Sequence, residues 1–182
     1  MRVAITGAHG VGKSTLAAEL SGVLAVPVLS TPGRTLASRG LPVNEDATVA
    51  SQAVAWLLQY RFEREQPAWV APRSLIDVWA YTVQAAERHV PMPVEAALLQ
   101  EVERSTPIAV AERYDHLIYI PPRIALQGDD VRPSGEAFQR STDEAIVSAL
   151  ARWQIPHTTL DVRDRSAVQA LIDRLAADAS TL

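Results

Sequence analysis

The sequence contains no cysteine, which excludes disulfides, catalytic thiolates and zinc sites built from cysteine. Histidine is scarce, and the spacing of the four histidines, at positions 9, 89, 116 and 157, is not that of metal ligands. Long apolar runs are also missing. Residues 3–5 are too short for the apolar core of a signal peptide, and no stretch approaches the roughly 20 apolar residues that span a bilayer. We therefore predict a cytoplasmic location and no membrane partner.

The chain has no net positive charge, because 17 Lys and Arg residues face 21 Asp and Glu residues, a formal net charge of −4. Without an overall positive field, a nucleic-acid partner such as duplex DNA is not favoured. Lysine is almost absent: Lys13 is the single lysine, and every other basic residue is arginine. Because an ammonium is compact whereas a guanidinium is a planar fork, Lys13 marks a position that needs a compact cation.

Residues 7–15 read GAHGVGKST, and Gly7, Gly12, Lys13 and Ser14 satisfy the P-loop pattern G-x-x-x-x-G-K-[ST]. The motif directly follows a short apolar segment and opens an apolar helical pattern, which is the context that the motif requires. Its glycines let backbone N–H groups turn toward phosphates, its lysine bridges the β- and γ-phosphates, and its serine binds Mg²⁺. The alternative is a glycine turn that only caps a helix.

We therefore expect ATP and Mg²⁺ as cofactors, with Ser14 as the metal ligand. The residues expected to hold the nucleotide are Gly7, His9, Gly10, Val11, Gly12, Lys13, Ser14 and Thr15. The Asn-Lys-x-Asp motif with which Ras-type GTPases bind guanine cannot occur, because the only lysine already belongs to the P-loop. The ABC signature is absent, and the chain is short for an AAA+ core with its helical subdomain.

Apolar strand-like segments alternate with helical patterns along the whole chain. The expected strands are residues 2–6, 27–29, 68–71, 116–120 and 157–160. The expected helices are residues 13–24, 33–40, 47–65, 75–88, a segment after Pro93 that runs to about 110, 136–153 and 166–177. This alternation predicts an α/β fold, a three-layer, doubly wound, mainly parallel five-stranded sheet with ligand sites at the carboxyl ends of the strands. We expect a single domain over residues 1–182, with a short lid at about 123–135.

Further polar residues stand near the expected strand ends or on the expected helices. They are Thr31-Pro32-Gly33-Arg34, Gln59 and Glu63 one helical turn apart, Pro72-Arg73-Ser74 followed by Asp77 and Tyr81, and Asp129-Asp130-Val131-Arg132. Together with the P-loop, these segments resemble the small P-loop nucleoside and nucleotide kinases, particularly the domains related to ribosylnicotinamide kinase and more distantly the thymidylate kinases. The resemblance covers nearly the whole chain, and only its P-loop is highly specific.

The resemblance implies an ATP-dependent, Mg²⁺-requiring phosphotransferase that moves the γ-phosphate to a nucleoside, a nucleotide or a similar small hydroxylated acceptor. It implies three catalytic residues, Lys13, Asp77 and Arg132, of which Arg132 would bring positive charge to the transferred phosphoryl group from the lid. The residues that it implies as acceptor contacts are Arg34, Gln59, Glu63, Arg73 and Tyr81. Residues 163–165 would border the adenine.

The chain departs from the family pattern where the family carries an aspartate that helps to hold Mg²⁺ or acts as a base. Pro72 stands at that position, and Asp77, one helical turn further on, is the nearest substitute. This departure leaves open an alternative, a non-catalytic or slowly hydrolysing nucleotide-binding regulatory module derived from such a kinase. A kinase that acts on a nucleic-acid end is disfavoured by the acidic balance, and a homodimer is compatible with the sequence.

Overall fold

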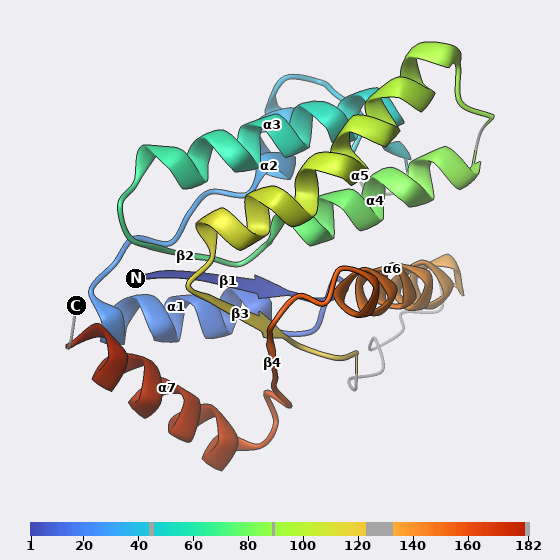
Figure 1. Ribbon diagram of the computed structural model, residues 1–182. Helices are drawn as coiled ribbons and strands as arrows, with labels where there is room; N and C mark the ends of the chain where they lie inside the picture. Colours follow the sequence, from blue (N-terminus) through green and yellow to red (C-terminus); the bar gives the residue numbers. More distant parts are fainter. Residues whose placement is uncertain (44–45, 89, 123–132, 181–182) are drawn as a thin grey trace.

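Each strand is followed by one or more helices along the chain (Figure 1). The computed structural model describes residues 1–43, 46–88, 90–122 and 133–180. Its strands are β1 (Arg2–Thr6), β2 (Trp69–Ala71), β3 (His116–Tyr119) and β4 (Thr158–Thr159). Its helices are α1 (Lys13–Leu24), α2 (Pro32–Ser38), α3 (Val49–Glu65), α4 (Leu75–Arg88), α5 (Pro93–Arg113), α6 (Pro133–Arg152) and α7 (Arg165–Ala179).

The strands form one parallel sheet in the order β2-β1-β3-β4, so the described part of the chain has four strands rather than the five expected. The missing strand, residues 27–29, forms only an isolated bridge between Val28 and Val70. Two backbone hydrogen bonds of 2.9 Å support it, from Leu29 N to Val70 O and from Val70 N to Pro27 O. Pro27 has no N–H to donate, and α2 begins at Pro32, so the segment cannot extend the ladder.

Helices cover both faces of the sheet, which confirms the predicted three-layer, doubly wound architecture (Figure 1). On one face α3, α4 and α5 bury a core that includes Trp56, Trp69 and Ile76, and α6 adds Ile146 to the same core. On the other face α1 and α7 pack together through apolar side chains such as Leu16 and Leu175. The whole described chain is therefore organised around a sheet whose two faces are both buried.

The parallel arrangement brings the carboxyl ends of β1, β2 and β3 to one edge of the sheet. The P-loop leaves β1 at this edge, and Thr6, the last residue of β1, pairs with Tyr119, the last residue of β3.

The predicted lid at about 123–135 falls mainly on residues 123–132, which lie outside the described residues, and α6 begins directly after them. No helix in the described ranges combines the length and apolar character needed to cross a membrane.

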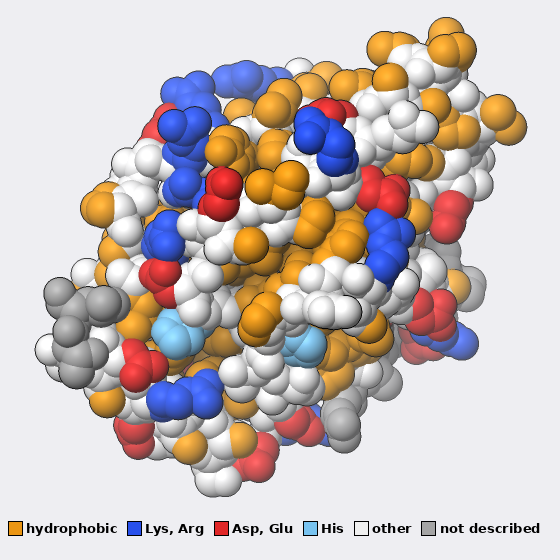
Figure 2. All heavy atoms as spheres, viewed as in Figure 1, with side chains coloured by type: hydrophobic (Ala, Val, Ile, Leu, Met, Phe, Trp, Pro, Cys, Tyr) orange, Lys and Arg blue, Asp and Glu red, His pale blue; other side chains and the backbone are white. Residues whose placement is uncertain are grey.

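Hydrophobic side chains also line a hollow between α5 and the end of α6 (Figure 2). The cavity there has a volume of about 330 Å³ and is lined by Pro107, Leu117, Trp153 and Ile155 among others. It lies beside the beginning of β3, whereas the P-loop lies at the carboxyl end of β1. This cavity is therefore separate from the edge of the sheet at which the P-loop motif is found.

Candidate active site

The P-loop has the backbone conformation that its glycines were expected to permit. Gly7, Gly10 and Gly12 have φ values of 146°, 78° and 97°, a region that residues with a side chain rarely adopt. At Gly7 a Cβ atom would also lie only 2.5 Å from the carbonyl oxygen of Ile120. The close approach of two backbones therefore requires glycine at this position.

Helix α1 begins directly after Gly12 and points its N-terminus into the loop. No side chain among the described residues caps this end of α1, so its first N–H groups are available to an anion. Ser14 and Thr15 are exposed on the first turn. The residues present therefore fit a nucleotide phosphate with Mg²⁺ at Ser14, because Mg²⁺ needs few protein ligands besides phosphate and water. No cluster of three or more metal-ligating side chains occurs within the described ranges.

Lys13 turns its ammonium back into the loop, where it is 8% exposed. Its Nζ donates hydrogen bonds to the carbonyl oxygens of Gly7 and Ala8, at 2.5 and 2.6 Å, and lies 3.9 Å from Oδ1 of Asp77. Burial lowers the pKa of Lys13 to about 8, and the nearby Asp77 carboxylate partly opposes this effect. Lys13 is thus a buried cation at the point where the motif places the phosphates.

Asp77 joins the P-loop to the beginning of α4. Its Oδ2 accepts hydrogen bonds from the backbone N and the Oγ of Ser74, at 2.8 and 2.6 Å, and its Oδ1 accepts one from Gly7 N at 3.3 Å. In return, Ser74 Oγ accepts a hydrogen bond from Asp77 N, the reciprocal arrangement of a capping box. Asp77 is fully buried. It lies beside Lys13 with both oxygens engaged by protein groups, and its catalytic role stays a prediction.

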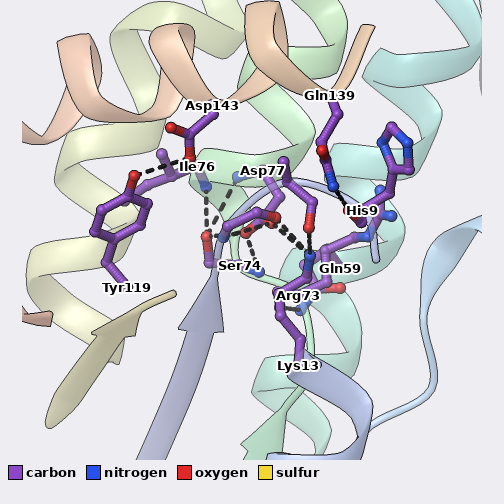
Figure 3. Close-up of polar contacts among 12 residues, drawn as sticks. His9, Lys13, Gln59, Arg73, Ser74, Ile76, Asp77, Tyr119, Gln139 and Asp143 are labelled. Carbon is purple, nitrogen blue, oxygen red and sulfur yellow. Dashed lines mark hydrogen bonds and ion pairs between the residues drawn. The ribbon is translucent and has the colours of Figure 1, made fainter. Parts of the chain in front are cut away.

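Arg73 brings a second cation to the site from the loop between β2 and α4. Its guanidinium lies 4.7 Å from the ring centroid of Tyr81 and is close enough to Lys13 to lower the pKa of the ammonium. Burial raises the pKa of Tyr81 above its ordinary value, so this phenol stays protonated. The structure thus brings Arg73 and Tyr81 together with Lys13 and Asp77, as Figure 3 shows for three of these four.

Gln59 and Glu63 lie in the interior and not on an open face. Gln59 Nε2 donates to Arg73 O at 3.0 Å and to Oε1 of Glu63 at 2.8 Å, and Tyr114 Oη donates to the same oxygen at 2.9 Å. Arg113 Nε lies 3.9 Å from the other oxygen. Burial raises the pKa of Glu63 to about 7, although these neighbours lower it. Glu63 has no exposed surface, and Gln59 connects it by hydrogen bonds to the backbone of the loop that carries Arg73.

Two predicted arginines are not part of this group. Arg34 is exposed on α2, and its side chain makes no hydrogen bond or ion pair within the described part of the chain. Arg132 lies outside the described residues. Their predicted roles as acceptor contact and catalytic residue therefore stay predictions.

Helix α6 supplies residues that the sequence analysis missed. Gln139 Nε2 donates to the carbonyl oxygen of the P-loop residue His9 at 2.7 Å, and Tyr119 Oη donates to Oδ1 of Asp143 at 2.8 Å. Figure 3 shows both contacts beside Asp77 and Ser74. Gln139 and Asp143 are four residues apart and so share one helix face. In the sequence, this spacing is the only sign that the two residues act together. Which face of α6 meets the P-loop follows only from the packing of the helix.

A cavity of about 150 Å³ lies on the other side of the P-loop, between α1 and α7. Its lining includes Gly12, Thr15 and Leu16 from the loop and α1, and Val162 and Arg165 from the segment that leads into α7. Of residues 163–165, which were expected to border the adenine, Arg165 lines this cavity, and the expectation stays a prediction. The lining is largely apolar beside the phosphate loop, as a planar base requires.

The chain is similar to known proteins in sequence and in fold. Residues 2–165 match a family model described as AAA domain. The match covers the P-loop domain and does not bear on the helical subdomain of an AAA+ core, for which the chain is short. No curated protein sequence matches the chain.

Several solved structures share the fold. A NadR protein in complex with NAD and AMP-PNP superposes with a TM-score of 0.71 at 17% identity, covering 98% of this chain and 49% of that chain. Deoxyadenosine kinase from M. mycoides with bound dCTP has a TM-score of 0.65 at 14% identity, covering 97% and 100%. Shikimate kinase from Bacteroides thetaiotaomicron has a TM-score of 0.51 at 14% identity, covering 97% of both chains. The chain spans about half the length of the NadR chains, and at these identities the likeness shows the fold alone.

The geometry at Gly7 predicts that Gly7→Ala destabilises the protein by on the order of 1–3 kcal/mol, because the methyl group meets Ile120 O and φ is positive. Gly22→Ala is the matched control. Gly22 lies in α1 with no atom within 4 Å of its added Cβ, so alanine there is expected to raise stability by about 0.5–1 kcal/mol. Urea unfolding measures both changes. A Gly7→Ala protein as stable as wild type would contradict the close approach.

The buried Glu63 predicts a pH-dependent stability. Its pKa of about 7 in the folded state exceeds the ordinary 4.5, so between these values the folded state binds more protons than the unfolded state, and stability falls as pH rises. Relative to Glu63→Gln, the wild type should lose on the order of 2–3 kcal/mol of unfolding free energy between pH 5 and pH 8. Denaturant unfolding at both pH values tests this, with the exposed Glu65→Gln as a control for charge loss. A difference that does not change with pH would disprove the assignment.

Proposed function

We propose, on the premise that this chain belongs to the AAA domain family, that it is a small kinase which transfers the γ-phosphate of ATP, with Mg²⁺, to a hydroxylated small molecule. The observation that carries the proposal is the position of Lys13. Its buried ammonium lies inside a P-loop at the carboxyl edge of the sheet, beside a second cation at Arg73 and the carboxylate of Asp77. Phosphoryl transfer depends on such placed positive charge, because charge spreads over the transferred oxygens.

The two sides of the P-loop suggest where the two substrates bind. The cavity between α1 and α7 would hold the nucleobase of ATP, with the phosphates over the N-terminus of α1. The acceptor would approach from the side of α4, where Arg73 and Tyr81 lie. Its hydroxyl oxygen would bond to the γ-phosphorus as the bond to the bridging oxygen of ADP breaks, and its proton would be released.

The solved structures with the same fold support a nucleotide substrate of this kind. One holds AMP-PNP and NAD, one is a deoxyadenosine kinase and one is a shikimate kinase, so acceptors differ widely on this fold. We therefore propose the acceptor class only as a small molecule with a free hydroxyl, a nucleoside or nucleotide being favoured by the sequence resemblance.

A second function is favoured by one specific observation. Pro72, which follows β2, brings no carboxylate, and both oxygens of Asp77 are engaged. A nucleotide-binding regulatory module without transfer activity would have the same P-loop. The two functions differ in one measurable respect, because only the kinase forms a phosphorylated acceptor.

The test incubates the protein with γ-labelled ATP and Mg²⁺ in the presence of a panel of nucleosides, nucleotides and sugars. The kinase account predicts label in at least one acceptor, and a loss of on the order of 10²-fold or more in Lys13→Ala, because the buried cation is removed. Arg104→Ala, an exposed arginine that pairs with Glu101 on α5, is the control and should keep full activity. Bound ATP without transfer to any acceptor would instead favour the regulatory module.

A further inference from the structure

The carboxylate that a phosphoryl-transfer site needs near its metal has not yet been assigned to a residue of this site. Sites for phosphoryl transfer keep a carboxylate near the hydrated Mg²⁺ of the nucleotide. Pro72 cannot supply it, and Asp77 already accepts hydrogen bonds from Ser74 and Gly7 on its two oxygens. Another carboxylate must therefore face the phosphates if the site is complete.

Asp143 is placed to be that carboxylate. It lies half-buried on α6, and its Oδ1 accepts a hydrogen bond of 2.8 Å from Tyr119 Oη. Tyr119 ends β3 and is paired with Thr6, the residue that leads into the P-loop. The strand beside the P-loop thus holds the carboxylate over the carboxyl edge of the sheet (Figure 3).

The helix that carries Asp143 is fixed to the site by independent contacts. One turn earlier, Gln139 bonds to His9 O, and the neighbouring Thr142 Oγ1 donates to Oε1 of Gln84 on α4 at 3.1 Å. These contacts anchor α6 to both the P-loop and α4, so the orientation of Asp143 does not depend on the hydrogen bond from Tyr119 alone.

The electrostatics of Asp143 agree with a role at the phosphates. Burial and the neighbouring charge of Glu144 raise the pKa of Asp143, whereas the hydrogen bond from Tyr119 and the charge of Lys13 oppose that rise, so carboxylate and ammonium lie close enough to affect each other. Its Oδ2 accepts no hydrogen bond from the described residues. A carboxylate beside a phosphate-binding lysine would repel the phosphates unless a cation lay between them.

We propose that Asp143, oriented by Tyr119, is a positioning residue that binds the water shell of the Mg²⁺ carried by the nucleotide, and so replaces the carboxylate missing at Pro72. The proposal rests on the proposed function, because it assumes that the P-loop binds Mg²⁺-ATP. Asp143 would act through metal-bound water, so its loss should weaken the contribution of Mg²⁺, whereas metal-free nucleotide binding should not become weaker, because a carboxylate that repels the phosphates is removed.

The test measures the affinity of the protein for AMP-PNP by calorimetry, once with Mg²⁺ and once with EDTA, and takes the ratio of the two dissociation constants. Asp143→Asn keeps the size and the acceptor oxygen for Tyr119, and should reduce the Mg²⁺-dependent gain in affinity by about 10-fold or more. Tyr119→Phe removes only the orienting hydroxyl and should reduce the gain in the same direction by less. Glu136→Gln, which removes an exposed charge in the first turn of α6, should leave the gain unchanged.

An unchanged Mg²⁺-dependent gain in a folded Asp143→Asn protein would overturn the proposal, as would a wild type whose affinity Mg²⁺ does not increase. If Asp143→Asn does not fold, Tyr119→Phe decides by the same criterion. The outcome is independent of the acceptor. A wild type that binds Mg²⁺-AMP-PNP but transfers no phosphate from ATP contradicts the kinase function alone, whereas an active kinase with an unchanged gain in Asp143→Asn contradicts the role of Asp143 alone.

Discussion

The buried ammonium of Lys13 is the constraint around which the rest of the site is arranged. A cation that is 8% exposed must be stabilised by nearby oxygens, and here the carbonyl groups of Gly7 and Ala8 and the carboxylate of Asp77 do so. These oxygens come from the P-loop and from α4, and the Asp143 carboxylate on α6 adds a longer-range attraction. Residues from elements that are far apart in the sequence thus meet at a single charge, the same charge that a phosphate would meet on entering the loop.

A buried network of hydrogen bonds connects the loop that carries Arg73 to the core of the protein. Glu63, Gln59 and Tyr114 form a chain of hydrogen bonds that ends on the backbone of Arg73 and Leu75, on the loop that carries the second cation and the capping box of α4. A buried network of this kind fixes one geometry, because each donor that loses its partner costs free energy. The position of Arg73 over Tyr81 therefore depends on residues that are buried in the structure, and the predicted role of Gln59 and Glu63 as acceptor contacts stays a prediction.

Most of the architecture could be predicted from the sequence, and the P-loop could be predicted most precisely. Its pattern is local, so glycine conformation, the helix start and the place of Lys13 follow from neighbouring residues. The strand expected at 27–29 was reduced to one bridge by Pro27, whose effect depends on which partner strand it meets. Gln59 and Glu63 have the spacing of a polar helix face, but Tyr114 and Arg113 bury them. The role of Asp143 depends on the packing of α6 against residues far away in the sequence.

The central claim is that Lys13 holds the phosphates of ATP for transfer. A crystal structure with AMP-PNP and Mg²⁺ tests it most directly. The account predicts that the Lys13 ammonium leaves the carbonyl oxygens of Gly7 and Ala8 for the β- and γ-phosphates, with the metal at Ser14 and the base in the cavity beside Gly12. A structure in which the nucleotide binds elsewhere, or in which Lys13 keeps its contacts with the loop and touches no phosphate, would contradict the account.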